Sequence, residues 1–318
     1  MTHAITTRRA ELAQRLSEHR SKIALLLVIG TIAAITAFKS EVFLSWANFE
    51  NILVQCSIIG ILAMGTTLLM VSGGIDLSVG SGVSLAGVLL ATLMADGWSP
   101  LIAVIAAIMT ASAVGGATGF LAAKSSHHPF VLTLGVLTLL QGVTLLVSIS
   151  PVTDIPESFI SIIDWRPLGL PLVVFVFGVV VVVTHLTLTY TALGRWLYAI
   201  GSSESAARLS GIRIDAVKVV VYAISGVFVG IGGVLMTAQL ASAQPEMGRG
   251  LELAAIAAVA VGGTPLAGGR GDVLGTLLGV LLLALIGNSL NLLSITSSWQ
   301  FVLQGLVIVI AVLAQRKT

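Results

Sequence analysis

Long runs of apolar residues alternate with short polar breaks along almost the whole chain. A helix needs roughly 20 apolar residues to cross the hydrocarbon core of a bilayer, and ten runs are candidates, although 251–263 is too short for a comfortable span. The predicted spans are 22–38, 51–71, 77–95, 99–122, 130–149, 169–190, 217–239, 251–263, 273–291 and 298–315. The pattern therefore predicts an all-α integral membrane protein with about ten transmembrane helices.

Composition agrees with this pattern and excludes a soluble globular protein. Charged residues make up only 9% of the chain and hydrophobic residues 56%, whereas soluble domains carry about 25% charged residues. The net charge of +2 comes from dispersed residues and gives no indication of nucleic-acid binding. Cys56 is the single cysteine, so no disulfide can form within the chain.

The positions of Lys and Arg predict the orientation in the membrane. If the N-terminus is inside and the spans alternate, most basic residues fall in internal segments, as the positive-inside rule requires. These internal residues are Arg8, Arg9, Arg15, Arg20, Lys22, Lys124, Arg195, Arg208, Arg213, Lys218, Arg316 and Lys317, with Arg270 as a further candidate. External segments keep Lys39, Arg166 and Arg249 together with most of the acids.

This orientation defines a simple domain organisation. We expect a cytoplasmic segment over 1–21, a single transmembrane domain over 22–315 and a cytoplasmic C-terminus over 316–318. The protein would then lie in the cell inner (plasma) membrane with both termini in the cytoplasm. The first apolar run lacks a clear small-residue cleavage motif, so it is interpreted as a retained span.

Two glycine-rich segments, 73–82 and 262–271, interrupt the apolar pattern. The pairs that match when the segments are aligned are Gly73/Gly262, Gly74/Gly263, Leu77/Leu266, Gly80/Gly269 and Gly82/Gly271. The match predicts an internal repeat. Paired interruptions of this kind mark broken helices in transporters, and tight turns at the cytoplasmic face are the alternative.

Small residues also recur at a spacing that favours close helix contact in membranes. The pairs are Gly115/Gly119, Gly226/Gly230 and Gly275/Gly279. This is a prediction about packing alone.

The longest charged internal loop, 191–218, contains the signals of a two-turn helix over 203–210. Ser203 suits the N-cap, and Glu204 lies in the first turn, where the helix dipole favours an acid. Arg208 lies in the last turn, and Gly211 can adopt the left-handed conformation that ends a helix. Because isolated helices this short are unstable, the helix must pack against the rest of the protein or against a partner.

Three stretches resemble, in the same order, the permease subunits of ABC importers for ribose, galactose, arabinose and related sugars. They are residues 72–81, residues 194–212, and residues 248–259 leading into 262–264 and 268–269. One departure is Ser203, where the family often has Asn. Since both residues cap helices well, little consequence is expected.

The resemblance implies a type II ABC-importer-like bundle whose cytoplasmic loop docks onto an ATPase subunit. It also implies a second permease subunit, identical or related, and a periplasmic or extracellular sugar-binding protein. In this chain, the residues that match the docking loop of the family are Gly194, Arg195, Ala199, Gly201, Ser203, Glu204, Ala207, Arg208 and Gly211. The chain has no phosphate-binding G-x-x-x-x-G-K-[ST] loop, so ATP hydrolysis is expected on the partner. We expect no enzyme activity, cofactor or metal in this chain.

Candidates for the translocation path or gate have structural alternatives. Asp76 lies at an apolar interior, where an acid is usually functional, but it could also cap the next span by accepting amide hydrogen bonds around Val79 and Gly80. Glu252 could contact the binding protein or cap a helix. Gly73, Gly74, Gly262 and Gly263 belong to the interruptions already described.

The amides on or near the spans are a further group of candidates. Each could contact a sugar or form an interhelical hydrogen bond. They are Asn51, Gln55, Gln239, Asn288 and Asn291. The competing function is an ion-coupled secondary transporter. Such a transporter would need a titratable group at mid-membrane, and Asp76 is the only good candidate for that group.

Overall fold

The computed structural model describes residues 22–125 and 129–296, together with 298–299, 301–303, 305–306 and 309. The predicted terminal segments 1–21 and 316–318 lie outside the described residues, as does much of the tenth predicted span. The described part is helical apart from loops and one isolated bridge between Val152 and Ala243. The predicted all-α class is therefore confirmed.

Nine of the ten predicted spans correspond to helices in the described residues. They are Lys22–Lys39, α2 (Trp46–Val71), α3 (Val79–Ala95), α4 (Pro100–Lys124), α5 (Pro129–Val147), α7 (Leu172–Tyr190), α10 (Ile214–Leu240), α11 (Leu251–Val261) and α12 (Val273–Leu292). Seven are long and apolar enough to cross a membrane, and α3 and α11 are shorter. Connecting helices include α6 (Glu157–Ile160), α8 (Ala192–Ser202) and α9 (Glu204–Leu209).

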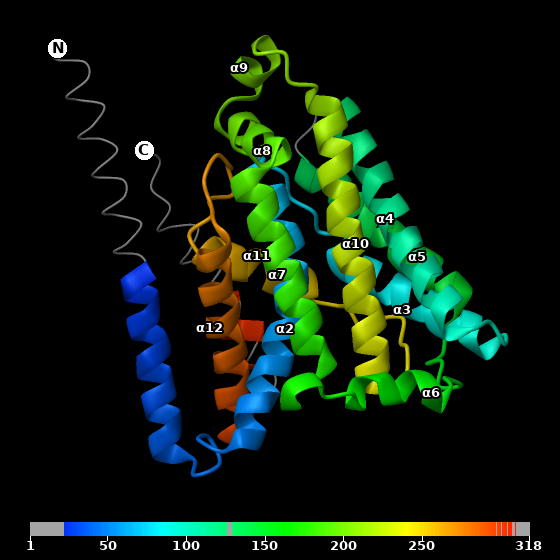
Figure 1. Ribbon diagram of the computed structural model, residues 1–318, viewed down its shortest axis with the longest axis vertical. Helices are drawn as coiled ribbons and strands as arrows, with labels where there is room; N and C mark the ends of the chain where they lie inside the picture. Colours follow the sequence, from blue (N-terminus) through cyan, green and yellow to red (C-terminus); the bar gives the residue numbers. More distant parts are fainter. Residues whose placement is uncertain are drawn as a thin grey trace.

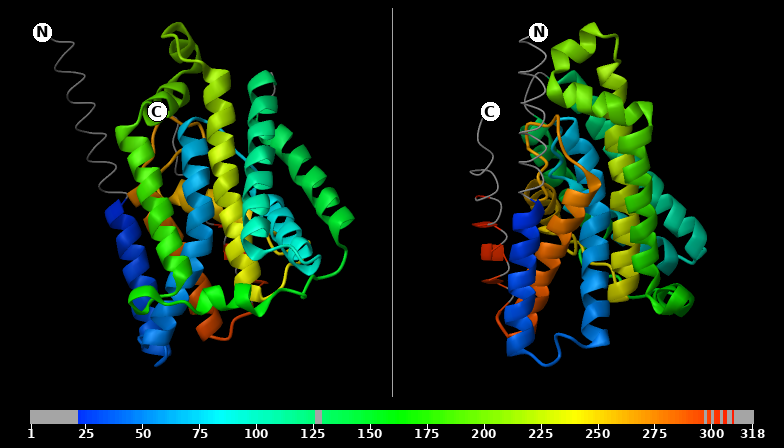
Figure 2. Two further views of the ribbon diagram at one scale, coloured as in Figure 1. Left: turned by 45° about the vertical axis from the view of Figure 1, so that its right-hand side comes forward. Right: turned by 60° about the vertical axis from the view of Figure 1, so that its left-hand side comes forward.

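Helix α2 lies at the centre of the bundle, where it packs against α7, α10, α11 and α12 (Figures 1 and 2). It begins earlier than the apolar run predicted, because Ser45 caps it by accepting a hydrogen bond from the Asn48 amide. Its 26 residues extend about 39 Å at 1.5 Å per residue. This helix is therefore long enough to cross the hydrocarbon core on its own.

The outer helices expose their apolar side chains. The Lys22–Lys39 helix, α4, α5 and α7 are largely unburied in their most apolar windows. Exposed apolar helix surface of this extent is what a lipid-facing helix presents, so these helices form the perimeter of the bundle.

Helices α4 and α10 form the most extensive helix pair in the bundle. A Cβ atom at Gly115 would overlap the carbonyl oxygen of Tyr222, and one at Gly226 would overlap the carbonyl oxygen of Ala111. The two backbones therefore touch directly, and the predicted close contact at the paired glycines is confirmed.

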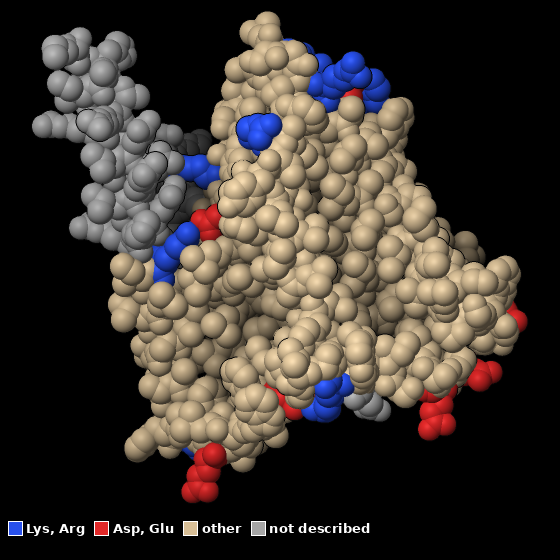
Figure 3. All heavy atoms as spheres, in the orientation of Figure 1, with Lys and Arg blue, Asp and Glu red and all other residues tan. Residues whose placement is uncertain are grey.

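Charged residues separate toward the two ends of the bundle (Figure 3). The end that carries α8 and α9, called here the basic end, exposes Lys124, Arg195, Arg208 and Arg213. The opposite end carries α6 with Glu157 and the ion pair between Arg166 and Glu50.

Candidate functional site

The 191–218 loop folds into two helices rather than the single helix that the sequence predicted. The additional helix, α8, is capped by Thr191, whose hydroxyl oxygen accepts a hydrogen bond from the Gly194 amide. It is amphipathic: Leu197 and Ile200 are buried while Arg195 and Trp196 are exposed. That periodicity, with Thr191 before it, is the signal that would have located α8.

Helix α9 matches the predicted helix closely. The Ser203 hydroxyl accepts from the Ala206 amide, and Gly211, at φ 83°, lies in the left-handed conformation just beyond the helix. Glu204 forms ion pairs with Arg208 at 3.5 Å and with Lys218 of α10 at 3.0 Å.

The packing of α9 is one-sided. Ala207 is buried against the protein, and Leu209 is 90% exposed. The protein itself thus supports one side of this short helix, and the other side is exposed and free to contact a partner.

Beneath α8, the two glycine-rich segments meet each other and Gly201, and we call this contact the glycine junction. The Gly269 amide donates a 2.9 Å hydrogen bond to the carbonyl oxygen of Val71, the last residue of α2. A Cβ atom at Gly201 would overlap both that oxygen and the Gly269 nitrogen, and one at Gly268 would overlap the Gly73 backbone. The three stretches that carry the family resemblance therefore converge through backbone atoms.

A second contact joins α8 to the same region. The Tyr198 hydroxyl donates a 2.7 Å hydrogen bond to the carbonyl oxygen of Gly271. Burial, and the negative charge of Asp272, raise the pKa of Tyr198, so its hydroxyl keeps the proton that it donates. Sequence reasoning did not identify Tyr198, because a lone tyrosine in a loop carries no distinctive spacing.

The two glycine-rich segments end their preceding helices in the same way. At the end of α2, the Gly73 amide donates to Met70 O and the Gly74 amide to Leu69 O. At the end of α11, the Gly263 amide donates to Ala260 O and the Thr264 amide to Val259 O. Both are Schellman motifs with a left-handed glycine, at Gly73 (φ 78°) and Gly263 (φ 100°).

This geometry changes the alignment of the repeat. Gly73 is structurally equivalent to Gly263, one residue later than the predicted match with Gly262. The glycine count favoured the wrong register because glycines also serve the junction at 268–269, beyond the helix ends.

Helices α3 and α11 begin inside the bundle rather than at its ends (Figures 1 and 2). The 11 residues of α11 extend about 16 Å, roughly half the thickness of the hydrocarbon core. The backbone from Gly74 to Ser78 is non-helical and buried, as is tolerated at membrane depth only where protein satisfies its polar groups. The first segment is therefore a buried interruption between α2 and α3 rather than a surface turn, whereas Gly263, Ala267 and Arg270 of the second segment are exposed.

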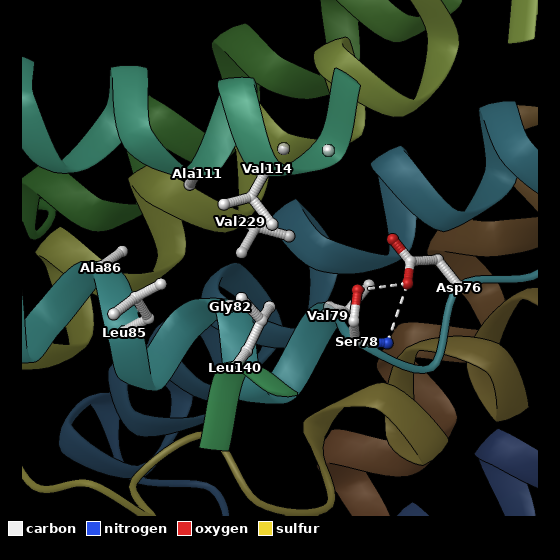
Figure 4. Close-up of a pocket in the computed structure, with 12 residues that line it drawn as sticks. Asp76, Ser78, Val79, Gly82, Leu85, Ala86, Ala111, Val114, Leu140 and Val229 are labelled. Carbon is white, nitrogen blue, oxygen red and sulfur yellow. Dashed lines mark hydrogen bonds between the residues drawn. The ribbon is translucent and has the colours of Figure 1, made fainter. Parts of the chain in front are cut away.

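Asp76 lies in the first interruption and is 5% exposed. Its Oδ1 atom accepts hydrogen bonds from the Ser78 amide at 2.8 Å and the Ser78 hydroxyl at 2.5 Å (Figure 4). Asp76 therefore has a local capping contact like the alternative considered from the sequence, but to Ser78, because its side chain folds back on the turn before α3. Asp76 also lines a small cavity with otherwise mainly apolar walls between α3, α4, α5 and α10.

Glu252 lies in the first turn of α11, where that helix approaches the start of α3. Its Oε1 atom accepts a hydrogen bond from the Gly250 amide at 3.2 Å, so it has the capping geometry considered from the sequence. A Cβ atom at Gly80 would overlap the other carboxylate oxygen. The beginnings of α3 and α11 are therefore in direct contact.

Four of the five amide candidates fall into two environments, while Asn51 is exposed near the start of α2. Asn288 is buried and forms reciprocal hydrogen bonds with Asn48 of α2, at 2.7 and 3.3 Å, which is the interhelical arrangement. Gln55 instead lines a cavity with Gln239 and Asn291.

The fold and the site together define a multi-span membrane protein of the transporter class. Comparison with known proteins gives the family. Residues 48–312 match the family described as branched-chain amino acid transport system / permease component. The chain belongs to this family.

Curated relatives match along nearly the whole chain. The ribose import permease protein RbsC of Escherichia coli K12 is 40% identical over 321 residues, covering 99% of each chain. RbsC of Haemophilus influenzae is 38% identical, covering 96% of this chain and 94% of its own. The D-allose transport system permease protein AlsC of Escherichia coli K12 is 35% identical, covering 90% and 88%. No solved structure matches.

These relationships confirm the predicted resemblance to ABC-importer permeases. The chain is the permease subunit of a binding-protein-dependent transporter, a multi-pass membrane protein and not itself an enzyme.

Proposed function

We propose that this chain carries ribose, or a closely similar monosaccharide, inward across the plasma membrane by alternating access. A separate ATPase docks on α8 and α9, a secreted binding protein delivers the sugar at the opposite end, and a second permease subunit completes the pathway. The observation that carries the proposal is the 40% identity with a ribose import permease over 99% of both chains.

The charge distribution supports the orientation in this proposal. The basic end faces the cytoplasm, because positively charged loops are retained there. Both termini are then cytoplasmic, and residues 22–315 form one transmembrane domain. In this orientation the opposite end, which carries α6, receives the binding protein.

The surface of α9 supports ATPase docking. Leu209 is 90% exposed, and in the proposed orientation it faces the cytoplasm, where no lipid covers it. Glu204 and Arg208 flank it, and the ion pairs with Lys218 and Asp215 fix α9 to the start of α10. A docked ATPase would cover Leu209 and act on α8, which contacts the glycine junction.

Co-purification from the native host tests the proposal. We expect the tagged chain in mild detergent to recover an ATPase with a phosphate-binding loop, and the reconstituted complex with its binding protein to take up ribose only with ATP. Recovery of the chain alone, with uptake driven by an ion gradient, would contradict the importer proposal.

A pair of exposed leucines tests the docking surface. Leu209→Glu should abolish recovery of the ATPase without unfolding the chain, because the side chain makes few contacts within it. Leu168→Glu, at the opposite end and also highly exposed at 93%, is the matched control and should leave recovery unchanged. Equal recovery with both variants would exclude α9 as the docking site.

The burial of Asp76 favours one competing function, an ion-coupled carrier, because carboxylates inside membranes often belong to proton or cation relays. The two functions differ in their driving force. Uptake that collapses with the ion gradient and persists without ATP would favour the carrier.

A further inference from the structure

The cavity that contains Gln55 lies between α2, α10, α11 and α12, toward the end opposite α8 and α9. Gln239 is in the last turn of α10, Asn291 in the last turn of α12, and Leu251 begins α11. The cavity volume is about 370 Å³, which is within the range of sites for small molecules.

Three amide side chains enter this cavity from three different helices. Within the described part of the chain, Gln55, Gln239 and Asn291 have no side-chain hydrogen bond, whereas Asn288, one turn before Asn291, is paired with Asn48. Interhelical bonding therefore accounts for Asn288. Gln55 is half-buried and Gln239 and Asn291 are exposed, so all three amides are free to hydrogen-bond a molecule in the cavity that they line.

The chemistry of the walls limits the class of ligand. Each amide both donates and accepts hydrogen bonds, as does each hydroxyl group. The remaining described wall residues are apolar, and none of them is charged. An uncharged polyhydroxylated molecule fits this lining, because its hydroxyl groups face the amides and its C–H groups face Ile58, Met236 and Leu283.

A free amino acid or a sugar phosphate fits poorly. Each carries full charges, and none of the described wall residues is charged to pair with them. The lining therefore favours the sugar cargo in the names of the relatives over the amino-acid cargo in the family description.

The cavity is closed on the side toward the glycine junction. A Cβ atom at Gly279 of α12 would overlap the Ala258 carbonyl oxygen of α11, and one at Gly275 would overlap the Gly262 carbonyl oxygen. Thr67 of α2 and Thr276 of α12 share a 2.8 Å hydrogen bond between their hydroxyls. The contacts of α12 with α11 and α2 therefore close this side of the cavity.

We infer that Gln55, Gln239 and Asn291 form a transient binding site for a neutral monosaccharide. The site lies on the side of the closed contact that faces away from the glycine junction. The inference rests on the proposed function and names the residues that receive the sugar. The site holds the sugar weakly, because its described lining offers only neutral hydrogen bonds and no aromatic side chain, and weak binding permits onward release.

Leucine substitutions in the reconstituted importer test the inference. Gln55→Leu, Gln239→Leu and Asn291→Leu should each lower the maximal rate of ATP-dependent ribose uptake at least about 5-fold, while the ATPase still co-purifies. Gln141→Leu, on exposed α5 outside the cavity, is the matched control and should stay within about 2-fold of the unmodified importer. Uptake within 2-fold for all three cavity variants would overturn the inference.

Thiol labelling gives a readout that does not depend on uptake. Leu290→Cys in a Cys56→Ala background places one thiol in the cavity wall and leaves all three amides in place. We expect millimolar ribose to slow labelling of this thiol, and leucine or ribose 5-phosphate to leave it unchanged. Labelling insensitive to ribose, or equally slowed by leucine, would overturn the inference.

The two proposals fail in distinguishable ways. If the unmodified importer carries no monosaccharide, the proposed function fails. If it carries ribose but neither the leucine variants nor the labelling respond, only the assignment of the amide site fails.

Discussion

The Gly269 amide donates a hydrogen bond to the carbonyl oxygen of Val71, and this bond joins the end of α2 to the segment between α11 and α12. Gly201 of α8 lies against both atoms with no room for a side chain. A displacement of α8 therefore reaches α2 and the segment after α11 at the same point, without passing through flexible side chains.

Gly201→Ala tests this connection. The added methyl group would overlap Val71 O and Gly269 N, so α8 must shift away from the junction. We expect ATP-dependent uptake to fall at least about 10-fold while the ATPase still binds, since α9 is unchanged. Gly178→Ala, where nothing lies within 4 Å of the added atom, is the control, and similar uptake by the two variants would contradict a coupling role for the junction.

Tyr198→Phe removes a single hydrogen bond from the same region. The bond to Gly271 O is worth about 1 kcal/mol, so the protein should fold normally. We expect fewer sugar molecules to be transported per ATP hydrolysed, because α8 holds the 262–271 segment less firmly. Tyr190→Phe, whose ring is 70% exposed, should leave this ratio unchanged, and an unchanged ratio for Tyr198→Phe as well would assign the bond to stability alone.

Asp76→Asn separates the importer from an ion-coupled carrier. Asparagine keeps an acceptor oxygen for the Ser78 amide and hydroxyl but loses the charge. In an ATP-driven permease, we expect uptake within about 3-fold of the unmodified protein. Complete loss of uptake with intact folding and ATPase binding would instead indicate that the charge takes part in transport.

Gly226→Ala tests the contact between α4 and α10. Forcing a methyl group into this close crossing should cost about 1–3 kcal/mol, because it overlaps the Ala111 carbonyl oxygen. Cys56 is the single cysteine and is buried, so its reaction with a fluorogenic thiol reagent reports unfolding. We expect the reaction at a lower temperature than in Gly178→Ala, and coincident curves would show that the crossing tolerates the added volume.

The sequence predicted the span positions and helix α9 well, because both depend on local signals. Apolar runs identify the spans, and Ser203 with Gly211 identifies the ends of α9. The glycine junction could not be predicted in the same way, since Gly73, Gly201 and Gly268 are far apart in sequence and meet only in the fold. The same reason explains the amide site: Gln55, Gln239 and Asn291 are separately unremarkable, and only the packing of α2, α10 and α12 brings them together.

The backbone character of the glycine junction has a consequence for how such transporters diversify. Because the junction recognises no side chain of a partner, the surface of α9 can adapt to a different ATPase while the junction stays the same. The amides of the cavity can likewise change without altering either. Under the proposed function, ATPase binding, coupling and sugar binding thus involve separate sets of residues, so a hybrid chain with a substituted α9 should bind a new ATPase and keep its original sugar.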